Sequence, residues 1–159
     1  MTGITVATIG YGDRTFSDVA AALTAHGIGF IADVRSIPYS RHAPDFTRDR
    51  LLHLAAEMNL GYRWLGDRLG GRPADPALWK DGRPDPDAIA GSGGFAAGIT
   101  ELEGLAATST LVLLCAELEP DGCHRATIIA PELERRGHHV VHILGDGSLV
   151  PHQPPLGLG

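Results

Sequence analysis

The most informative stretch of this chain is Thr110-Leu-Val-Leu-Leu-Cys115-Ala-Glu-Leu-Glu-Pro-Asp-Gly-Cys123-His124-Arg125, which contains both of its cysteines. Residues 110–114 are almost continuously apolar, which is typical of a buried strand. Residues 126–136 have the pattern of a helix that ends at Gly137. Cys115 therefore leaves the carboxyl end of a strand and Cys123 lies near the start of a helix. In open α/β sheets, ligands bind at this edge.

The same alternation of strand and helix extends in both directions from this stretch. We expect further strands at 4–9, 28–34, 62–65 and 139–144, and further helices at 18–26, 50–59 and 95–106. This order predicts a single three-layer α/β domain over residues 1–150, Rossmann-like or flavodoxin-like, with a mostly parallel sheet of about five strands. Residues 66–94 are rich in Gly, Pro and Asp and predict a long loop that covers an active site, and residues 151–159 predict a C-terminal tail.

The composition of the chain argues against some classes of protein. The chain has 159 residues, 43% of them hydrophobic, and a formal net charge of −6. This charge argues against a broad basic surface for nonspecific binding of nucleic acid. No apolar run approaches a membrane span, and the N-terminus lacks the pattern of a signal peptide. We therefore expect a cytoplasmic protein without a membrane partner, whose two cysteines stay reduced.

Three loops are expected to meet at the carboxyl edge of the predicted sheet, following the strands at 4–9, 28–34 and 110–114. The segment 69–72, after the strand at 62–65, is expected to join them. These segments bring together arginines that would bind an anion, with one tyrosine and one histidine beside them, and two acids for proton transfer. The predicted anion-binding residues are Arg35, Arg41, Arg72, Arg125, Tyr11 and His124, and the predicted general acid/base residues are Asp33 and Glu117. The alternative is that these arginines pair with the acids as a structural scaffold.

The two cysteines have different expected roles. Cys123 is the predicted nucleophile, because a helix N-terminus and the neighbouring His124 and Arg125 favour a thiolate. Cys115 is expected to be a small buried apolar residue. The two are eight positions apart, not in a Cys-x-x-Cys pair, and no matching Cys/His pair lies elsewhere, so no metal site is predicted.

Taken together, several motifs resemble one family, called domain of unknown function 488. The resemblance rests on Thr8-Ile-Gly10-Tyr11, Asp33-Val-Arg35-Ser-Ile-Pro38-Tyr-Ser-Arg41, Leu69-Gly-Gly-Arg72, the Cys-Ala-Glu…Pro…Cys-His-Arg segment and Val141-His142-Ile143. It covers residues 4–150, and the cysteine segment is its most specific part. The resemblance implies a compact bacterial or archaeal α/β domain with an unassigned site at these motifs, and it implies no substrate.

Three functions remain open from the sequence. The first is an enzyme that acts on a small anionic substrate, similar to a nucleotide or a sugar phosphate. The second is a nucleic-acid or nucleotide binding module without catalysis, in which Tyr11, Tyr39, Phe46 and Trp64 would stack on bases. The third is a thiol redox protein that uses Cys115 and Cys123. The sequence indicates neither a cofactor nor an oligomeric state.

Overall fold

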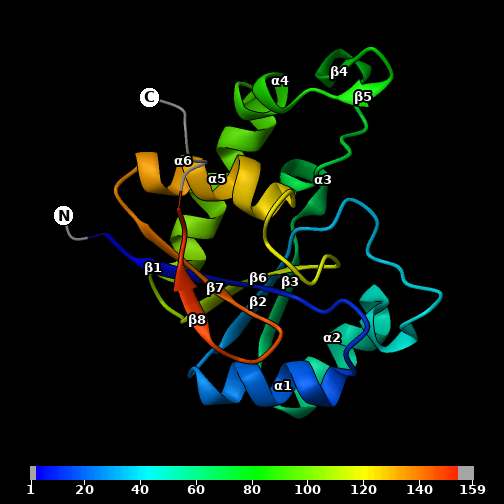
Figure 1. The fold of residues 1–159 in the computed structure, drawn as a ribbon, viewed down its shortest axis with the longest axis vertical. Coiled ribbons are helices and arrows are strands. Elements are labelled where there is room, and N and C mark those ends of the chain that lie inside the picture. The colour runs from blue at the N-terminus through cyan, green and yellow to red at the C-terminus, as the bar shows by residue number, and fades with distance from the viewer. Residues whose placement is uncertain (1–2, 154–159) are drawn as a thin grey trace.

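The computed structural model describes residues 3–153, which form a six-stranded sheet with helices on both faces (Figure 1). The strand order is β3-β2-β6-β1-β7-β8. The strands are β1 (Thr5–Gly10), β2 (Phe30–Asp33), β3 (Gly61–Trp64), β6 (Leu111–Cys115), β7 (His139–Ile143) and β8 (Leu149–Pro151). The first five run parallel, and β8 pairs antiparallel with β7. The predicted mostly parallel α/β sheet is confirmed, with β8 as an added edge strand.

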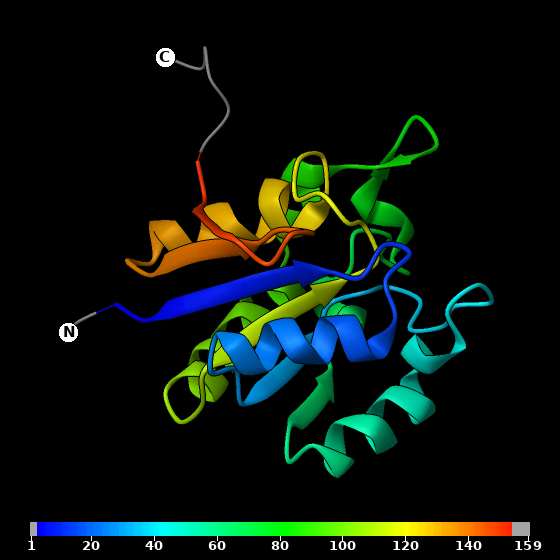
Figure 2. The same cartoon turned by 60° about the horizontal axis from the view of Figure 1, so that its bottom comes forward.

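Four longer helices complete the layers (Figure 2). Helices α1 (Phe16–Ala25) and α2 (Arg48–Glu57) pack on one face, and α5 (Gly93–Ala106) and α6 (Ala130–Arg135) pack on the other. The buried residues of β1 alternate between the faces, because successive side chains of a strand point in opposite directions. Helix α1 begins two residues earlier than the sequence pattern suggests, because Thr15 and Asp18 form a capping box. No helix of residues 3–153 combines the length and the apolar character needed to cross a membrane.

The segment predicted as a long loop, 66–94, contains several short elements. It forms α3 (Gly66–Leu69), a 3-10 turn (Pro76–Leu78), a hairpin of β4 (Trp79–Lys80) and β5 (Arg83–Pro84), and α4 (Pro86–Ala90). Asp81 and Gly82 both have positive φ, at 54° and 77°, which suits a tight two-residue hairpin turn. The backbone of this segment therefore forms local hydrogen bonds within these short elements. Pro151 belongs to β8, and residues 154–159 of the predicted tail lie outside the described residues.

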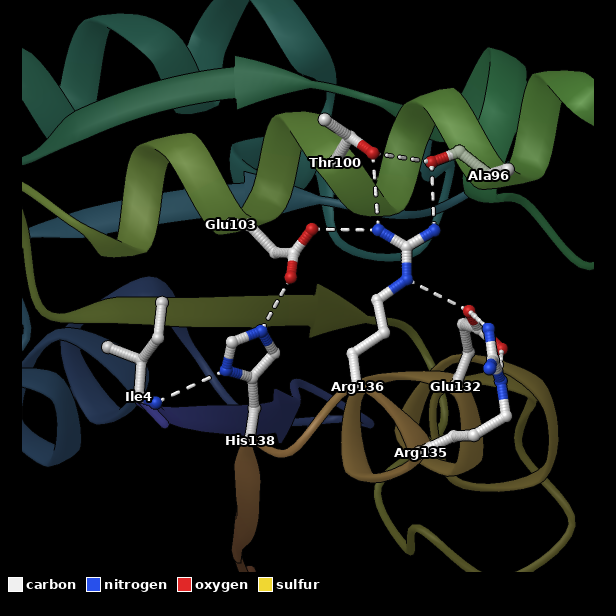
Figure 3. Close-up of polar contacts among 8 residues, drawn as sticks. All are labelled: Ile4, Ala96, Thr100, Glu103, Glu132, Arg135, Arg136 and His138. Carbon is white, nitrogen blue, oxygen red and sulfur yellow. Dashed lines mark hydrogen bonds and ion pairs between the residues drawn. The ribbon is translucent and has the colours of Figure 1, made fainter. Parts of the chain in front are cut away.

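A polar network ties α5 to α6 and to the start of β1 (Figure 3). Glu103 accepts hydrogen bonds from Arg136 at 2.7 Å and from His138 at 2.6 Å. The other ring nitrogen of His138 accepts the backbone N–H of Ile4, and Arg136 also pairs with Glu132 at 2.9 Å. The hydrogen bond from His138 lowers the pKa of Glu103, against the opposing effect of burial and with help from Arg136. This network holds the helical layer to the sheet, away from the carboxyl edge.

Candidate functional site

A cavity of about 450 Å³ lies at the carboxyl edge of the sheet, beside the ends of β1, β2 and β6. Its lining includes Tyr11, Arg35, Arg72, Cys115, Glu117 and His124. The structure thus brings together the loops that follow the three central strands. Two other hollows of similar volume, about 480 Å³ beside residues 80–86 and about 540 Å³ over α1, are lined by neither cysteine nor histidine. The chemically distinctive residues lie in the first cavity.

Both cysteines contribute to the wall of this cavity with His124. The loop 116–122, which we call the cysteine loop, turns back so that the Sγ atoms of Cys115 and Cys123 lie 3.2 Å apart. Nδ1 of His124 lies 3.8 Å from the Sγ of Cys115 and 3.9 Å from that of Cys123. Both cysteines are buried and free. We call these three residues the thiol–imidazole cluster.

The orientation of the His124 ring is fixed by the neighbouring strand end. Nε2 of His124 lies 2.8 Å from the carbonyl oxygen of Val34. A carbonyl only accepts, so Nε2 carries the proton and donates it. In the neutral imidazole Nδ1 is then the acceptor, and it faces the two sulfurs.

The two thiols differ in acidity. A hydrogen bond from Cys123 lowers the pKa of Cys115, against the opposing effect of burial and with help from the Glu117 backbone amide and the charge of Arg125. The same pairing, together with burial, raises the pKa of Cys123. The structure thus gives the more acidic thiol to Cys115, whereas the sequence pattern favoured Cys123 as nucleophile. The difference arises mainly from the hydrogen bond that Cys123 donates to Cys115, which depends on the path of the loop between them and is not visible in the sequence.

Arg125 lies beneath the cysteine loop and does not face the cavity. It is fully buried and donates to the carbonyl oxygens of Glu117 at 2.8 Å and Leu118 at 3.2 Å, and to the hydroxyl of Thr8 at 3.2 Å. It starts a π-helical turn, Arg125–Ile129, which precedes Pro131 near the start of α6. Such wide turns are frequent at functional sites, and a proline lacks the N–H that a regular helix needs. Of the predicted anion-binding residues, Arg125 therefore serves to hold the loop.

The close fit beneath the loop also explains Gly10 at the end of β1. A Cβ atom at this position would collide with the carbonyl oxygen of Glu117. Backbone N–H groups of Tyr11 and Gly12 donate to the carbonyls of Cys115 and Ala116 at 3.1 and 2.8 Å. The cysteine loop thus lies directly on the loop that follows β1.

Arg35 lines the cavity although it is largely buried. Asp33, which is fully buried, accepts from Nε of Arg35 at 2.8 Å and from Nη2 at 2.7 Å. The Tyr62 hydroxyl donates to the same carboxylate at 2.5 Å, and Arg35 Nη1 donates to the Tyr11 hydroxyl at 3.2 Å. Burial alone would lower the pKa of Arg35, but its hydrogen bonds to Asp33 and the charge of that carboxylate raise it above its usual value. Burial and the same carboxylate raise the pKa of Tyr62.

Of the remaining predicted site residues, Arg72, Glu117 and Tyr11 line the cavity and Arg41 does not. Arg72 is exposed at the cavity wall, with its guanidinium 5.0 Å from the ring centre of Trp79, and Glu117 is exposed at the same cavity. Tyr11 stacks on Phe46 with ring centres 4.1 Å apart. The face of Tyr11 that meets Phe46 is therefore unavailable to a ligand base. Arg41 is exposed and does not line the cavity.

Two exposed side chains at this cavity were not among the predicted catalytic and anion-binding residues. Ile37 is 68% exposed and Tyr39 is 60% exposed, and both line the cavity from the loop after β2. Ile37 received no role and Tyr39 only a role in base stacking. Both lie within a motif that was recognised for its arginines.

Comparison with known proteins assigns the family. The family model described as Domain of unknown function DUF488 matches residues 15–130, which is most of the chain. The chain therefore belongs to the DUF488 family, as the motifs around Cys115 and Cys123 suggested. Neither the curated proteins nor the solved structures contain a match to it.

Proposed function

We propose that this protein is an enzyme that acts on a small anionic substrate of the nucleotide or sugar-phosphate class, bound in the cavity at the carboxyl edge of the sheet. One observation carries the proposal: the thiol–imidazole cluster and the two arginines Arg35 and Arg72 line the same cavity. A cavity of about 450 Å³ has the size of known small-molecule sites. Packing alone requires neither the cavity nor this combination of side chains.

The two arginines would bind the anion in complementary ways. Arg35 is held in place by Asp33, so little side-chain entropy is lost when a ligand binds. Arg72 is exposed and rests against Trp79, so its planar guanidinium is free to approach a phosphate. We assign Asp33 the role of positioning Arg35, because its carboxylate is already occupied by Arg35 and Tyr62.

Glu117 is the proposed proton carrier. It is exposed at the cavity and follows Cys115 by two positions, so its carboxylate has access both to solvent and to a bound ligand. The reacting centre is the thiol–imidazole cluster beside it.

A second candidate is a nucleotide-binding module without catalysis. The exposed Ile37 and Tyr39 at the cavity support it, because apolar and aromatic side chains offer a surface on which a base stacks. Oligonucleotide binding that weakens steeply with salt would favour this candidate over the enzyme, since it reports several phosphate contacts. Binding of mononucleotides alone favours the enzyme.

A third candidate is a thiol redox function. The 3.2 Å separation of the Sγ atoms of Cys115 and Cys123 supports it, because little movement separates this pair from a disulfide. A thiol titration after mild oxidation tests it, and two thiols that remain free would exclude it.

The anion site is tested by thermal denaturation of the full chain with inorganic phosphate, nucleoside monophosphates and sugar phosphates. A ligand at a hundred times its Kd stabilises by about 2.7 kcal/mol, which raises the Tm of a chain of this size by roughly 5–10 °C. Arg72→Ala should lose most of this shift. Arg50→Ala is the matched control, because Arg50 is an exposed arginine that pairs with Asp45 away from the cavity. Equal shifts in all three proteins, or no shift with any of these anions, would refute the proposed site.

A further inference from the structure

The thiol–imidazole cluster has the donor set of a metal site. Cys115, Cys123 and His124 each offer one ligand atom, and the three atoms lie within 4.8 Å of one another. The spacing of these residues along the chain gave no reason to expect this. The cysteine loop, which turns at Gly122 with a φ of 79°, brings Cys123 back to Cys115.

The separations of the donor atoms match the coordination sphere of zinc. A circle through three atoms separated by 3.2, 3.8 and 3.9 Å has a radius of about 2.1 Å. An ion about 1 Å above this plane would lie about 2.3 Å from each donor, which is the usual Zn–S distance and slightly longer than Zn–N. In a tetrahedral site with Zn–S of about 2.3 Å the sulfurs lie about 3.8 Å apart, so the Sγ atoms of Cys115 and Cys123 would separate by about 0.6 Å when an ion binds.

The second ring nitrogen of His124 supports the same assignment. Metal-binding histidines usually donate this N–H to a carboxylate or backbone carbonyl, which fixes the ring and leaves the other nitrogen free for the ion. Here Nε2 donates to the Val34 carbonyl at 2.8 Å, and Nδ1 faces the sulfurs. The strand end of β2 therefore holds His124 in the ligating orientation.

Charge and chemistry identify the kind of ion. Two thiolates and a divalent cation sum to zero, so a buried site gains no net charge when the ion binds. Thiolate and imidazole ligands select zinc among the common divalent ions, whereas magnesium and calcium prefer oxygen. Among residues 3–153, no fourth histidine, cysteine or carboxylate joins this cluster. Three protein ligands with an open fourth position are typical of catalytic rather than structural zinc.

We propose that Cys115, Cys123 and His124 bind one zinc ion whose fourth position opens into the anion-binding cavity. All three residues line that cavity, and Arg35 and Arg72 line it with them. The fourth position would hold water or an oxygen of the substrate. Binding of the ion stands on the geometry of the cluster alone, and only its use in catalysis rests on the proposed function.

The direct test measures the metal without any substrate. The full chain is loaded with Zn²⁺, dialysed, and its zinc is quantified, and the same protein is titrated with Co²⁺ to follow the thiolate-to-cobalt charge-transfer band. We expect one equivalent of zinc per chain and a saturable cobalt band. Cys115→Ser, Cys123→Ser and His124→Ala should each weaken binding more than about 100-fold, since loss of an outer-shell partner alone costs 10–100-fold. His53→Ala is the control, because His53 is exposed on α2.

A second measurement uses the unaltered protein, so that a variant that fails to fold does not leave the question open. Zn²⁺ should protect both thiols from Ellman's reagent, and a chelator should restore their reactivity. Two results would overturn the assignment. One is bound zinc below about 0.1 equivalent per chain after dialysis, because two thiolates and an imidazole should retain the ion. The other is thiols that react or form a disulfide equally fast with and without Zn²⁺. Zinc binding without any anion-dependent Tm shift would instead retain the metal site and refute the proposed function.

Discussion

The buried pair of Asp33 and Arg35 makes the sharpest prediction about stability. Asp33 is fully buried and Arg35 is 5% exposed, and two hydrogen bonds of 2.8 and 2.7 Å join them. The substitution Asp33→Asn keeps the shape of the side chain but removes its charge, which leaves a guanidinium buried without an anion. Breaking a buried pair in this way costs about 3–5 kcal/mol.

Urea denaturation followed by circular dichroism measures this cost. With a slope of roughly 2 kcal/mol per M, the midpoint of Asp33→Asn should fall by about 2 M. Replacing both partners removes the uncompensated charge, so Asp33→Asn combined with Arg35→Met should be more stable than Asp33→Asn alone. Asp45→Asn serves as the control, because the exposed pair of Asp45 and Arg50 is worth at most about 1 kcal/mol.

Two results would refute this reasoning. One is a cost of less than about 1 kcal/mol for Asp33→Asn, which is the range of an exposed pair. The other is strict additivity in the double variant, which would mean that the two side chains do not interact energetically. In either case Asp33 would not be the residue that holds Arg35 at the cavity.

Three further predictions concern the scaffold. The pKa of His142 is lowered to about 4, mainly by burial and further by the charges of His152 and Arg125. Between pH 6.5 and 4 the unfolded chain therefore binds a proton that the folded chain does not. Stability should therefore fall by up to roughly 3 kcal/mol between pH 6.5 and 4, and an equally steep fall in His142→Gln would contradict this. Glu103→Gln should lower the unfolding free energy by about 1–2 kcal/mol at pH 7, measured by urea denaturation, because two charged hydrogen bonds are weakened at a partly exposed site. Gly10→Ala should cost about 1–3 kcal/mol or prevent folding, because its Cβ meets the backbone of the cysteine loop, and a midpoint equal to wild type would contradict the close approach.

The central strands were predictable because each is an apolar run followed by a turn. The run at 110–114 became β6, at the centre of the sheet, and the loops after β1, β2 and β6 meet as the parallel arrangement requires. Strand β8 was not predictable, because its three residues are too few to show a period and it includes Pro151. The hairpin at 79–84 did carry a signal, the Asp81-Gly82 pair, within a segment whose composition suggested only a loop.

The directions of the side chains at the site could not be predicted from the sequence. Arg125 and Cys123 are two positions apart, yet Cys123 lines the cavity and Arg125 points beneath the loop. Arg125 begins the π-helical turn, whereas Cys123 precedes it. The approach of Cys115 to Cys123 and His124 depends on the path of the seven residues of the cysteine loop, which residue spacing alone does not specify.

The two buried arginines of this site have different electrostatic consequences. The charge of Arg35 is balanced by the Asp33 carboxylate, so Arg35 would bind an anion through its remaining N–H donors more than through net potential. The hydrogen-bond partners of Arg125 are three neutral oxygens, which satisfy its N–H groups but leave its charge in place. A fixed positive charge beneath the cysteine loop favours anionic groups above it, whether thiolates, a metal-bound hydroxide or a substrate phosphate. The buried guanidinium of Arg125 therefore has two effects: it holds the cysteine loop, and its charge favours anionic groups at the cavity.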